Sequence, residues 1–206
     1  MIAAQLNATD SMAWESLSNG GVILLPTDTV WGLACDFENG DALRKLYGLK
    51  RTEPRQTALL ISDIDQLEGL NIELDGMAAK LAARFWPGAL TIVVPADSPR
   101  LGLVAGPDRT IGIRLPDCQR LQRLIRGYGR PLAASSANFT GQKSPRFLAD
   151  VPSSIISGVD AVIEPETHTS GIASAVVKCV GDGWRYLRAG AIKETDIRRA
   201  IENDAG

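Results

Sequence analysis

The chain has 206 residues, of which 45% are hydrophobic and 22% charged, and its formal net charge is −2 at pH 7. This composition is typical of a globular protein with one sizeable core, and no apolar run approaches the roughly 18 residues that span a bilayer. We therefore expect a single domain over residues 1–206 and no membrane partner, and the charge does not favour a dedicated nucleic-acid-binding protein.

The cysteines and the histidine exclude several kinds of site. Cys35, Cys118 and Cys179 are far apart and form no C-x-x-C pair, which favours free thiols in a reducing compartment. The N-terminus lacks the basic and apolar segments of a signal peptide, so we expect a cytoplasmic protein. His168 is the only histidine. A single histidine excludes a His-cluster metal site, and any Ser-His-Asp triad would depend on this one residue. We predict no metal ligands.

Apolar segments of strand length alternate with segments of helical periodicity. Strands are predicted at residues 22–26, 57–61, 89–95, 110–116, 161–163, 173–180 and 184–188. Helices are predicted at residues 41–49 and 77–85, after a cap at Asp117 and ending near Gly127, and after a cap at Thr195. Arg120, Arg123 and Arg126 have helical spacing and are assigned to a solvated helix face. Because several strands follow one another directly, we expect an α/β protein with a mixed sheet.

Residues 131–145, PLAASSANFTGQKSP, change abruptly from apolar to polar. Hydroxyl groups and backbone N–H groups donate, a glycine lets the backbone approach, and a lysine supplies charge, which suits an oxyanion such as phosphate or carboxylate. An ordinary polar loop after a buried strand is the alternative.

Residues 110–116, TIGIRLP, alternate cleanly, with Thr110, Gly112 and Arg114 on one face. The planar fork of an arginine suits a carboxylate or phosphate, and a glycine leaves space beside it. A half-exposed edge strand with a solvated arginine is the alternative.

Residues 26–34, PTDTVWGLA, follow a wholly apolar strand. Thr27, Asp28 and Thr29 therefore stand at the carboxyl end of a strand, where open α/β sheets bind ligands. The alternative is a strand-to-turn junction with Trp31 in the core. Lys50 and Arg51 end a predicted helix, where cations also occur only to offset the helix dipole.

The order of these segments, together with FWPGALTIVV at 85–94, ASAVV at 173–177 and YLRAGAI at 186–192, resembles the YrdC/Sua5 family of threonylcarbamoyl-AMP synthases. The resemblance covers about residues 20–192 and matches the short, single-domain form. It implies a twisted mixed sheet with flanking helices and a concave basic face. It also implies synthesis of L-threonylcarbamoyl-adenylate from L-threonine, bicarbonate and ATP, with release of pyrophosphate. The product feeds the N6-threonylcarbamoyl modification of tRNA adenosine 37 through a downstream transferase machinery.

The resemblance also implies roles for individual residues. The threonine side would be formed by Thr27, Thr29, Arg114, Ala134 and Ser174. The nucleotide side would be formed by Thr110, Ser136, Asn138, Ser144 and Arg188, with Lys143 and Arg55 as further cations. Lys50 corresponds to the lysine of the family motif K-x-R, near the phosphates, and Arg51 is assigned a catalytic role beside it.

Two segments depart from the family pattern, at three positions. Thr52 stands where K-x-R has its second cation, and Gln56 stands where the family commonly has asparagine; a guanidinium of Arg51 or Arg55 can reach the same phosphate from a neighbouring position. Ala175 replaces the threonine of the family motif S-T-V-V. An RNA-binding module and a paralogue acting on another carbamoyl or acyl adenylate therefore stay open as alternatives.

The implied chemistry needs positioning rather than a side-chain nucleophile. A carbamate held in line with the α-phosphate and cations that neutralise the phosphates would suffice. Mg2+ is expected to bridge the polyphosphate with few protein ligands, because it keeps its waters.

Overall fold

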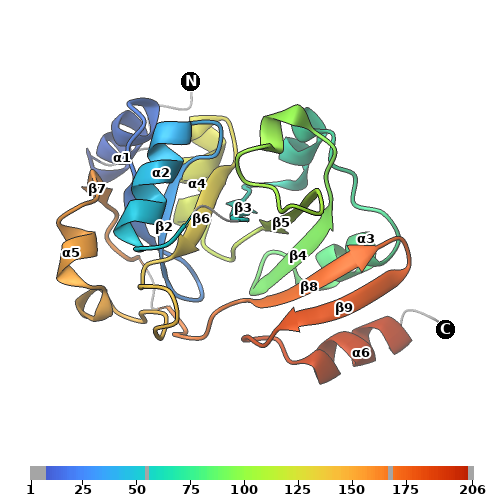
Figure 1. Cartoon of the computed structure of the whole chain (residues 1–206). Helices are drawn as coiled ribbons and strands as arrows, with labels where there is room; N and C mark the ends of the chain where they lie inside the picture. Colours follow the sequence, from blue (N-terminus) through green and yellow to red (C-terminus); the bar gives the residue numbers. More distant parts are fainter. Residues whose placement is uncertain (1–7, 54–55, 167–168, 204–206) are drawn as a thin grey trace.

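The computed structural model of the chain describes residues 8–53, 56–166 and 169–203. One nine-stranded sheet, in the order β7-β1-β2-β6-β3-β5-β4-β8-β9, runs through it (Figure 1). The strands are β1 (Ile23–Pro26), β2 (Trp31–Asp36), β3 (Ala58–Leu60), β4 (Leu90–Pro95), β5 (Thr110–Arg114), β6 (Leu132–Ser136), β7 (Ala161–Val162), β8 (Ala175–Val180) and β9 (Gly183–Arg188).

The sheet is mixed, as predicted. The pairs β1–β7, β3–β5 and β4–β8 are parallel, and the other neighbouring pairs are antiparallel. The strand β5 lies inside the sheet between β3 and β4, so the interpretation of this segment as a half-exposed edge strand is wrong.

The helices are α1 (Ala8–Ser18), α2 (Gly40–Leu49), α3 (Gly76–Phe85), α4 (Gln119–Tyr128), α5 (Ser153–Ile156) and α6 (Glu194–Asn203), with short 3-10 helices at η2 (Ile64–Leu70), η3 (Pro99–Leu101) and η4 (Leu148–Asp150). Two predicted caps are wrong. Cys118 occupies the N-cap position of α4, and Gly129, in a left-handed conformation, is its C-cap. Thr195 lies inside the first turn of α6.

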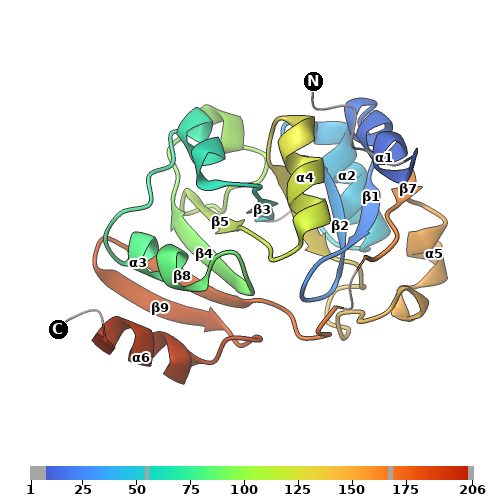
Figure 2. The same ribbon diagram turned by 180° about the vertical axis from the view of Figure 1, so that it is seen from behind.

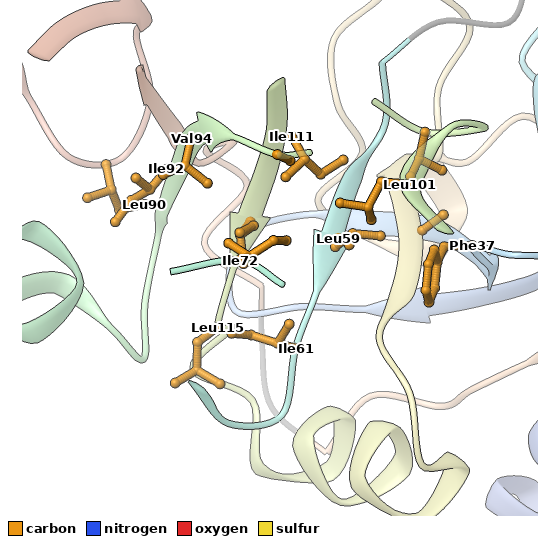
Figure 3. Close-up of a cluster of buried hydrophobic side chains, with 14 of the residues drawn as sticks. Phe37, Leu59, Ile61, Ile72, Leu90, Ile92, Val94, Leu101, Ile111 and Leu115 are labelled. Carbon is orange, nitrogen blue, oxygen red and sulfur yellow. The ribbon is translucent and has the colours of Figure 1, made fainter. Parts of the chain in front are cut away.

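Two apolar clusters form the core, on opposite faces of the sheet. Along β1, Leu24 belongs to the first cluster and its neighbours Ile23 and Leu25 to the second. The first cluster packs α2 and α3 against the sheet, and Figure 3 shows part of it, including Leu59, Ile92 and Ile111. The second packs α1 and α4 against the opposite face, and Figures 1 and 2 show α2 and α4 in front in opposite views.

The second cluster covers only one end of its face. Its strand residues come from β1, β2, β3, β6 and β7. Residues of β4, β5 and β8 on that same face, such as Val93, Gly112 and Val176, line a cavity instead. The part of this sheet face that the helices leave uncovered can therefore bind a ligand.

The arginines of α4 differ in their surroundings. Arg120 is buried, and it donates to Asp10 Oδ1 at 2.8 Å and to the carbonyl of Glu164 at 2.5 Å. The assignment of Arg120 to a solvated face is therefore wrong, because a carboxylate from α1 compensates its charge. Arg123 and Arg126 are about half exposed.

The cysteines are free, with Cys35 and Cys179 buried in the core and Cys118 half-buried. Within the described ranges, none of the helices is long and apolar enough to cross a membrane.

Candidate functional site

A cavity of about 510 Å³ occupies the part of the sheet face that α1 and α4 leave open. Every strand of the sheet except β7 contributes to its lining. Alternation explains the lining of the central strands, because Gly112 and Arg114 of β5 face the cavity while Ile111 and Ile113 face the core. The predicted site residues that line it are Thr27, Thr29, Arg114, Ala134, Ser136, Ser144, Ser174 and Arg188.

Arg114 is held rigidly at the cavity wall. Its Nε donates to the carbonyl of Gly88 at 2.9 Å, one terminal nitrogen donates to Thr29 Oγ1 at 2.8 Å, and the other donates to Asp28 Oδ1 at 2.6 Å. Burial lowers the pKa of this guanidinium, Asp28 opposes the shift, and the nearby Arg188 adds to it. The group stays charged, and the remaining N–H groups of a fixed fork suit a carboxylate.

The turn between β1 and β2 presents hydroxyl groups to the cavity. Thr27 Oγ1 lies 2.8 Å from Thr29 Oγ1 and donates to the carbonyl of Val30 at 2.8 Å. A second segment supports this turn from outside, since the N–H groups of Ser170 and Gly171 donate to the carbonyls of Asp28 and Thr29. Both threonines are buried, so their hydroxyl groups are fixed before any ligand binds.

The opposite wall is built from the start of β8 and the end of β9. Arg188 donates from one terminal nitrogen to the carbonyl and to the hydroxyl of Ser174, at 2.8 and 3.1 Å. Gly190 allows this contact, because a Cβ there would lie 2.3 Å from the carbonyl carbon of Ser174. The exposed Arg188 side chain therefore reaches the cavity from its rim.

The polar stretch after Leu132 divides between the strand β6 and the loop that follows it. Lys50 is almost fully buried, and its Nζ donates to the carbonyls of Ser136 and Asn138. Asn138 donates to the carbonyls of Phe139 and Gln142, at 2.9 and 2.8 Å. Its Oδ1 is buried and has no hydrogen-bond partner among the described residues. Lys50 thus fixes the loop after β6, and Asn138 Oδ1 is an acceptor of this loop without a partner among the described residues.

Five predicted residues do not line the cavity. Lys50 and Asn138 lie beneath its wall, and Thr110 is linked to the lining residue Gln56, whose amide donates to the Thr110 carbonyl at 2.8 Å. Lys143 is exposed on the loop. The guanidinium of Arg51 stacks on the ring of Phe139, 4.4 Å from its centroid. Arg55 and His168 lie outside the described residues.

The family model described as telomere recombination, which covers Sua5, YciO and YrdC proteins, matches residues 15–190. The chain belongs to the Sua5/YciO/YrdC family. It is 36% identical over 190 residues to threonylcarbamoyl-AMP synthase of Bacillus subtilis (strain 168), covering 90% of this chain and 54% of that protein. The crystal structure of P. abyssi Sua5 complexed with L-threonine matches with a TM-score of 0.84 at 29% identity, covering 93% of this chain and 57% of that chain.

E. coli YciO shares the fold, with a TM-score of 0.80 at 22% identity over 91% of this chain and 92% of that chain. The fold of this chain, a mixed sheet with helices packed on both faces, is therefore that of the Sua5/YciO/YrdC family. The chain spans about half the length of the Bacillus and P. abyssi relatives that it matches.

The departures of this Sua5/YciO/YrdC chain from the family pattern differ in their consequences. Ala175 is fully buried in the core, so the threonine it replaces would also face away from the cavity. Thr52 is half-buried at the end of α2 and brings no charge. Gln56, by contrast, lines the cavity.

The sequence did not predict the parts that three lining or supporting residues play, although it placed Asp28 at the ligand-binding end of a strand. Asp28 orients Arg114, Gln56 holds Thr110, and Thr91 lines the cavity from β4. Thr91 had a signal, because it is the only hydroxyl residue in an otherwise apolar strand. In the part of the chain that the structure describes, no group of three or more His, Cys, Asp and Glu side chains could hold a metal ion.

Proposed function

We propose that this protein is a threonylcarbamoyl-AMP synthase, which converts L-threonine, bicarbonate and ATP into L-threonylcarbamoyl-adenylate and pyrophosphate. The observation that carries the proposal is the fixed Arg114 fork with the Thr27–Thr29 turn on one part of a large cavity, and Ser136 and Ser144 on another part. A ligand in which an amino acid is joined to a nucleotide needs polar groups at both parts of the cavity. The similarity to the Bacillus synthase supports the same activity.

In the proposed reaction, the cavity residues act by positioning the reactants. The threonine amine adds to the carbon of CO2 or bicarbonate and forms a carbamate, with water leaving when bicarbonate reacts. A carbamate oxygen then attacks the α-phosphorus of ATP, and the bond to pyrophosphate breaks. Arg114 and the Thr29 hydroxyl would hold the threonine carboxylate, with Thr27, Ala134 and Ser174 around the amino acid.

The nucleotide would lie against the other wall. We assign Thr110, Ser136, Asn138, Ser144, Arg188, Lys143 and Arg55 to the nucleotide. Lys50 and Arg51 would neutralise phosphate charge, Lys50 from beneath the wall through the loop that it holds.

Mg2+ would supply charge neutralisation on the polyphosphate. The described residues around the cavity fit an ion held by phosphate and water oxygens, because the carboxylate beside it, Asp28, already pairs with Arg114.

An RNA-binding module without catalysis finds less support. Many of the cations that could form a basic face are paired with carboxylates, among them Lys45 with Asp160, Arg130 with Asp36 and Lys178 with Asp108. We propose that any tRNA contact serves delivery of the adenylate to a downstream transferase machinery. A basic concave face stays a prediction.

The test is pyrophosphate release by the purified protein with ATP, Mg2+, bicarbonate and one amino acid at a time. We expect release that depends on threonine. Release that is unchanged when threonine is omitted contradicts the proposal, and release with a different amino acid supports the paralogue.

A further inference from the structure

Thr91 lies between the two polar walls of the cavity. The register that pairs Ile92 of β4 with Ile113 of β5 places Thr91 beside Arg114 at the next position of the antiparallel pair. On its other side Thr91 is aligned with Val176 of β8, two residues after Ser174. Thr91 is buried yet lines the cavity, so its side chain can reach a ligand that Arg114 holds.

Both branches of the Thr91 side chain are engaged. Its Oγ1 lies 2.9 Å from the Ser174 hydroxyl oxygen. Its methyl group packs over Gly112, where an added Cβ would lie 3.2 Å from Thr91 Cγ2. A β-branched residue with these two contacts is held in one rotamer, so the direction of its hydroxyl group is fixed.

Thr91 and Ser174 have two hydroxyl protons between them. Arg188 donates to the Ser174 hydroxyl oxygen at 3.1 Å, so that oxygen acts as an acceptor. One of the two hydroxyl protons lies in the bond between Thr91 and Ser174. The other has no acceptor within residues 8–53, 56–166 and 169–203. It is available to a ligand oxygen in the cavity.

We propose that Thr91 is a positioning and specificity residue for the amino acid substrate, acting with Ser174. The pair donates one hydrogen bond to an acceptor oxygen of the amino acid or its carbamate. The amino acid is favoured over the phosphates because Thr91 is the neighbour of Arg114. This inference rests on the proposed function, since it assumes that Arg114 holds a carboxylate.

The experiment compares three variants with the full chain. Thr91→Val keeps the shape and removes the hydroxyl group, whereas Thr91→Ser keeps the hydroxyl group and removes the methyl group. Thr195→Val makes the same exchange on the exposed surface of α6 and serves as the control. L-threonine binding is measured by titration calorimetry, and KM is measured separately for threonine and for ATP.

We expect Thr91→Val to weaken threonine binding and to raise KM for threonine about tenfold, the effect of one hydrogen bond to a charged group. KM for ATP should stay within about twofold, and Thr91→Ser should restore most of the threonine affinity. The double variant Thr91→Val with Ser174→Ala should lose less threonine affinity than the sum of the two single effects, because the pair donates only one hydrogen bond to the ligand.

Unchanged threonine affinity in Thr91→Val, a rise confined to KM for ATP, or additive effects in the double variant would each overturn the inference. Those results leave the proposed function intact if the unmodified protein releases pyrophosphate with threonine. If that protein binds threonine without releasing pyrophosphate, the proposed reaction fails and calorimetry still tests Thr91. If it binds no threonine, both fail.

Discussion

Arg114 donates to Asp28 across 2.6 Å, with about 7% and 17% of the two side chains exposed. The two residues are 86 positions apart in the chain. They join the middle of the sheet to the turn after β1. This ion pair keeps a charged guanidinium at the cavity wall, where solvent alone would not compensate its burial.

Removing the Asp28 carboxylate, which compensates the charge of Arg114, should destabilise the fold. We expect Asp28→Ala to lower the free energy of unfolding by about 3 kcal/mol, because it leaves Arg114 buried without its counter-charge. Asp41→Ala, which breaks the exposed pair with Arg44, should change it by less than about 0.5 kcal/mol. Urea denaturation measures both, and equal effects of the two variants would show that Asp28 does not compensate Arg114.

We expect Arg114 to contribute to threonine binding, whereas Arg120, which forms a similar buried ion pair, should not. Arg120 is buried to the same degree and pairs with Asp10 at 2.8 Å, but it does not line the main cavity. We expect Arg114→Lys to raise KM for threonine about tenfold or more, since a lysine loses the fork geometry.

Arg120→Lys is the matched control for this exchange and should lower stability without changing KM for threonine. Steady-state kinetics of both variants provide the check. A similar rise in both would mean that the effect of Arg114→Lys comes from general destabilisation.

Much of the sheet was predictable because its residues alternate locally. In β5 the alternation of Ile111 and Ile113 with Gly112 and Arg114 assigned both faces correctly. The helix α2 was predictable because its buried residues Ala42, Leu43, Leu46 and Tyr47 have helical spacing. Such short-range patterns are properties of the segment itself.

Features that depend on distant contacts were not predictable in this way. The helix α1 buries only a few residues, such as Ala13 and Leu17, and has no clear periodicity. The burial of Arg120 depends on Asp10, 110 residues away. The spacing of Arg120, Arg123 and Arg126 carries no information about that partner.

The sequence predicted many of the residues that line the cavity, but it did not predict which residues lie behind the cavity wall. The cavity brings together Thr29, Arg114, Ser136 and Ser174, and the roles assigned to them stay predictions. Lys50 was expected among the phosphates, but the structure places it under the wall, bound to carbonyls of the loop after β6. The packing of α2 against β2 decides which side of the wall the Lys50 ammonium group reaches.

Lys50 should therefore support the loop. We expect Lys50→Met to lower the free energy of unfolding by about 2 kcal/mol, because two carbonyl groups lose a charged donor. Lys80→Met on the exposed side of α3 should have almost no effect. Thermal denaturation compares the two variants, and an unchanged midpoint for Lys50→Met would contradict the supporting role.

The core thiols should make stability fall at alkaline pH. Burial raises the pKa of Cys35 from 9.0 to about 12, and the nearby Asp36 adds to the shift. Below pH 9 both the folded and the unfolded chain keep this proton. Above it only the folded chain does, so the contribution to stability is lost as pH rises toward 12.

Urea denaturation at about pH 8 and about pH 10.5 should therefore show a smaller loss of stability in Cys35→Ala than in the unmodified protein. Some loss should remain, because burial also raises the pKa of Cys179 to about 11. An equal loss of stability in both proteins would mean that folding does not raise the pKa of Cys35.

The reaction itself is tested most directly by following carbon from bicarbonate. The protein is incubated with L-threonine, ATP, Mg2+ and carbon-13 bicarbonate, and the nucleotide products are measured by mass spectrometry. We predict an adenylate that carries threonine and one labelled carbon, formed by the unmodified protein and greatly reduced in Arg114→Lys. An adenylate without the label, or no adenylate that depends on threonine, would contradict the proposed function.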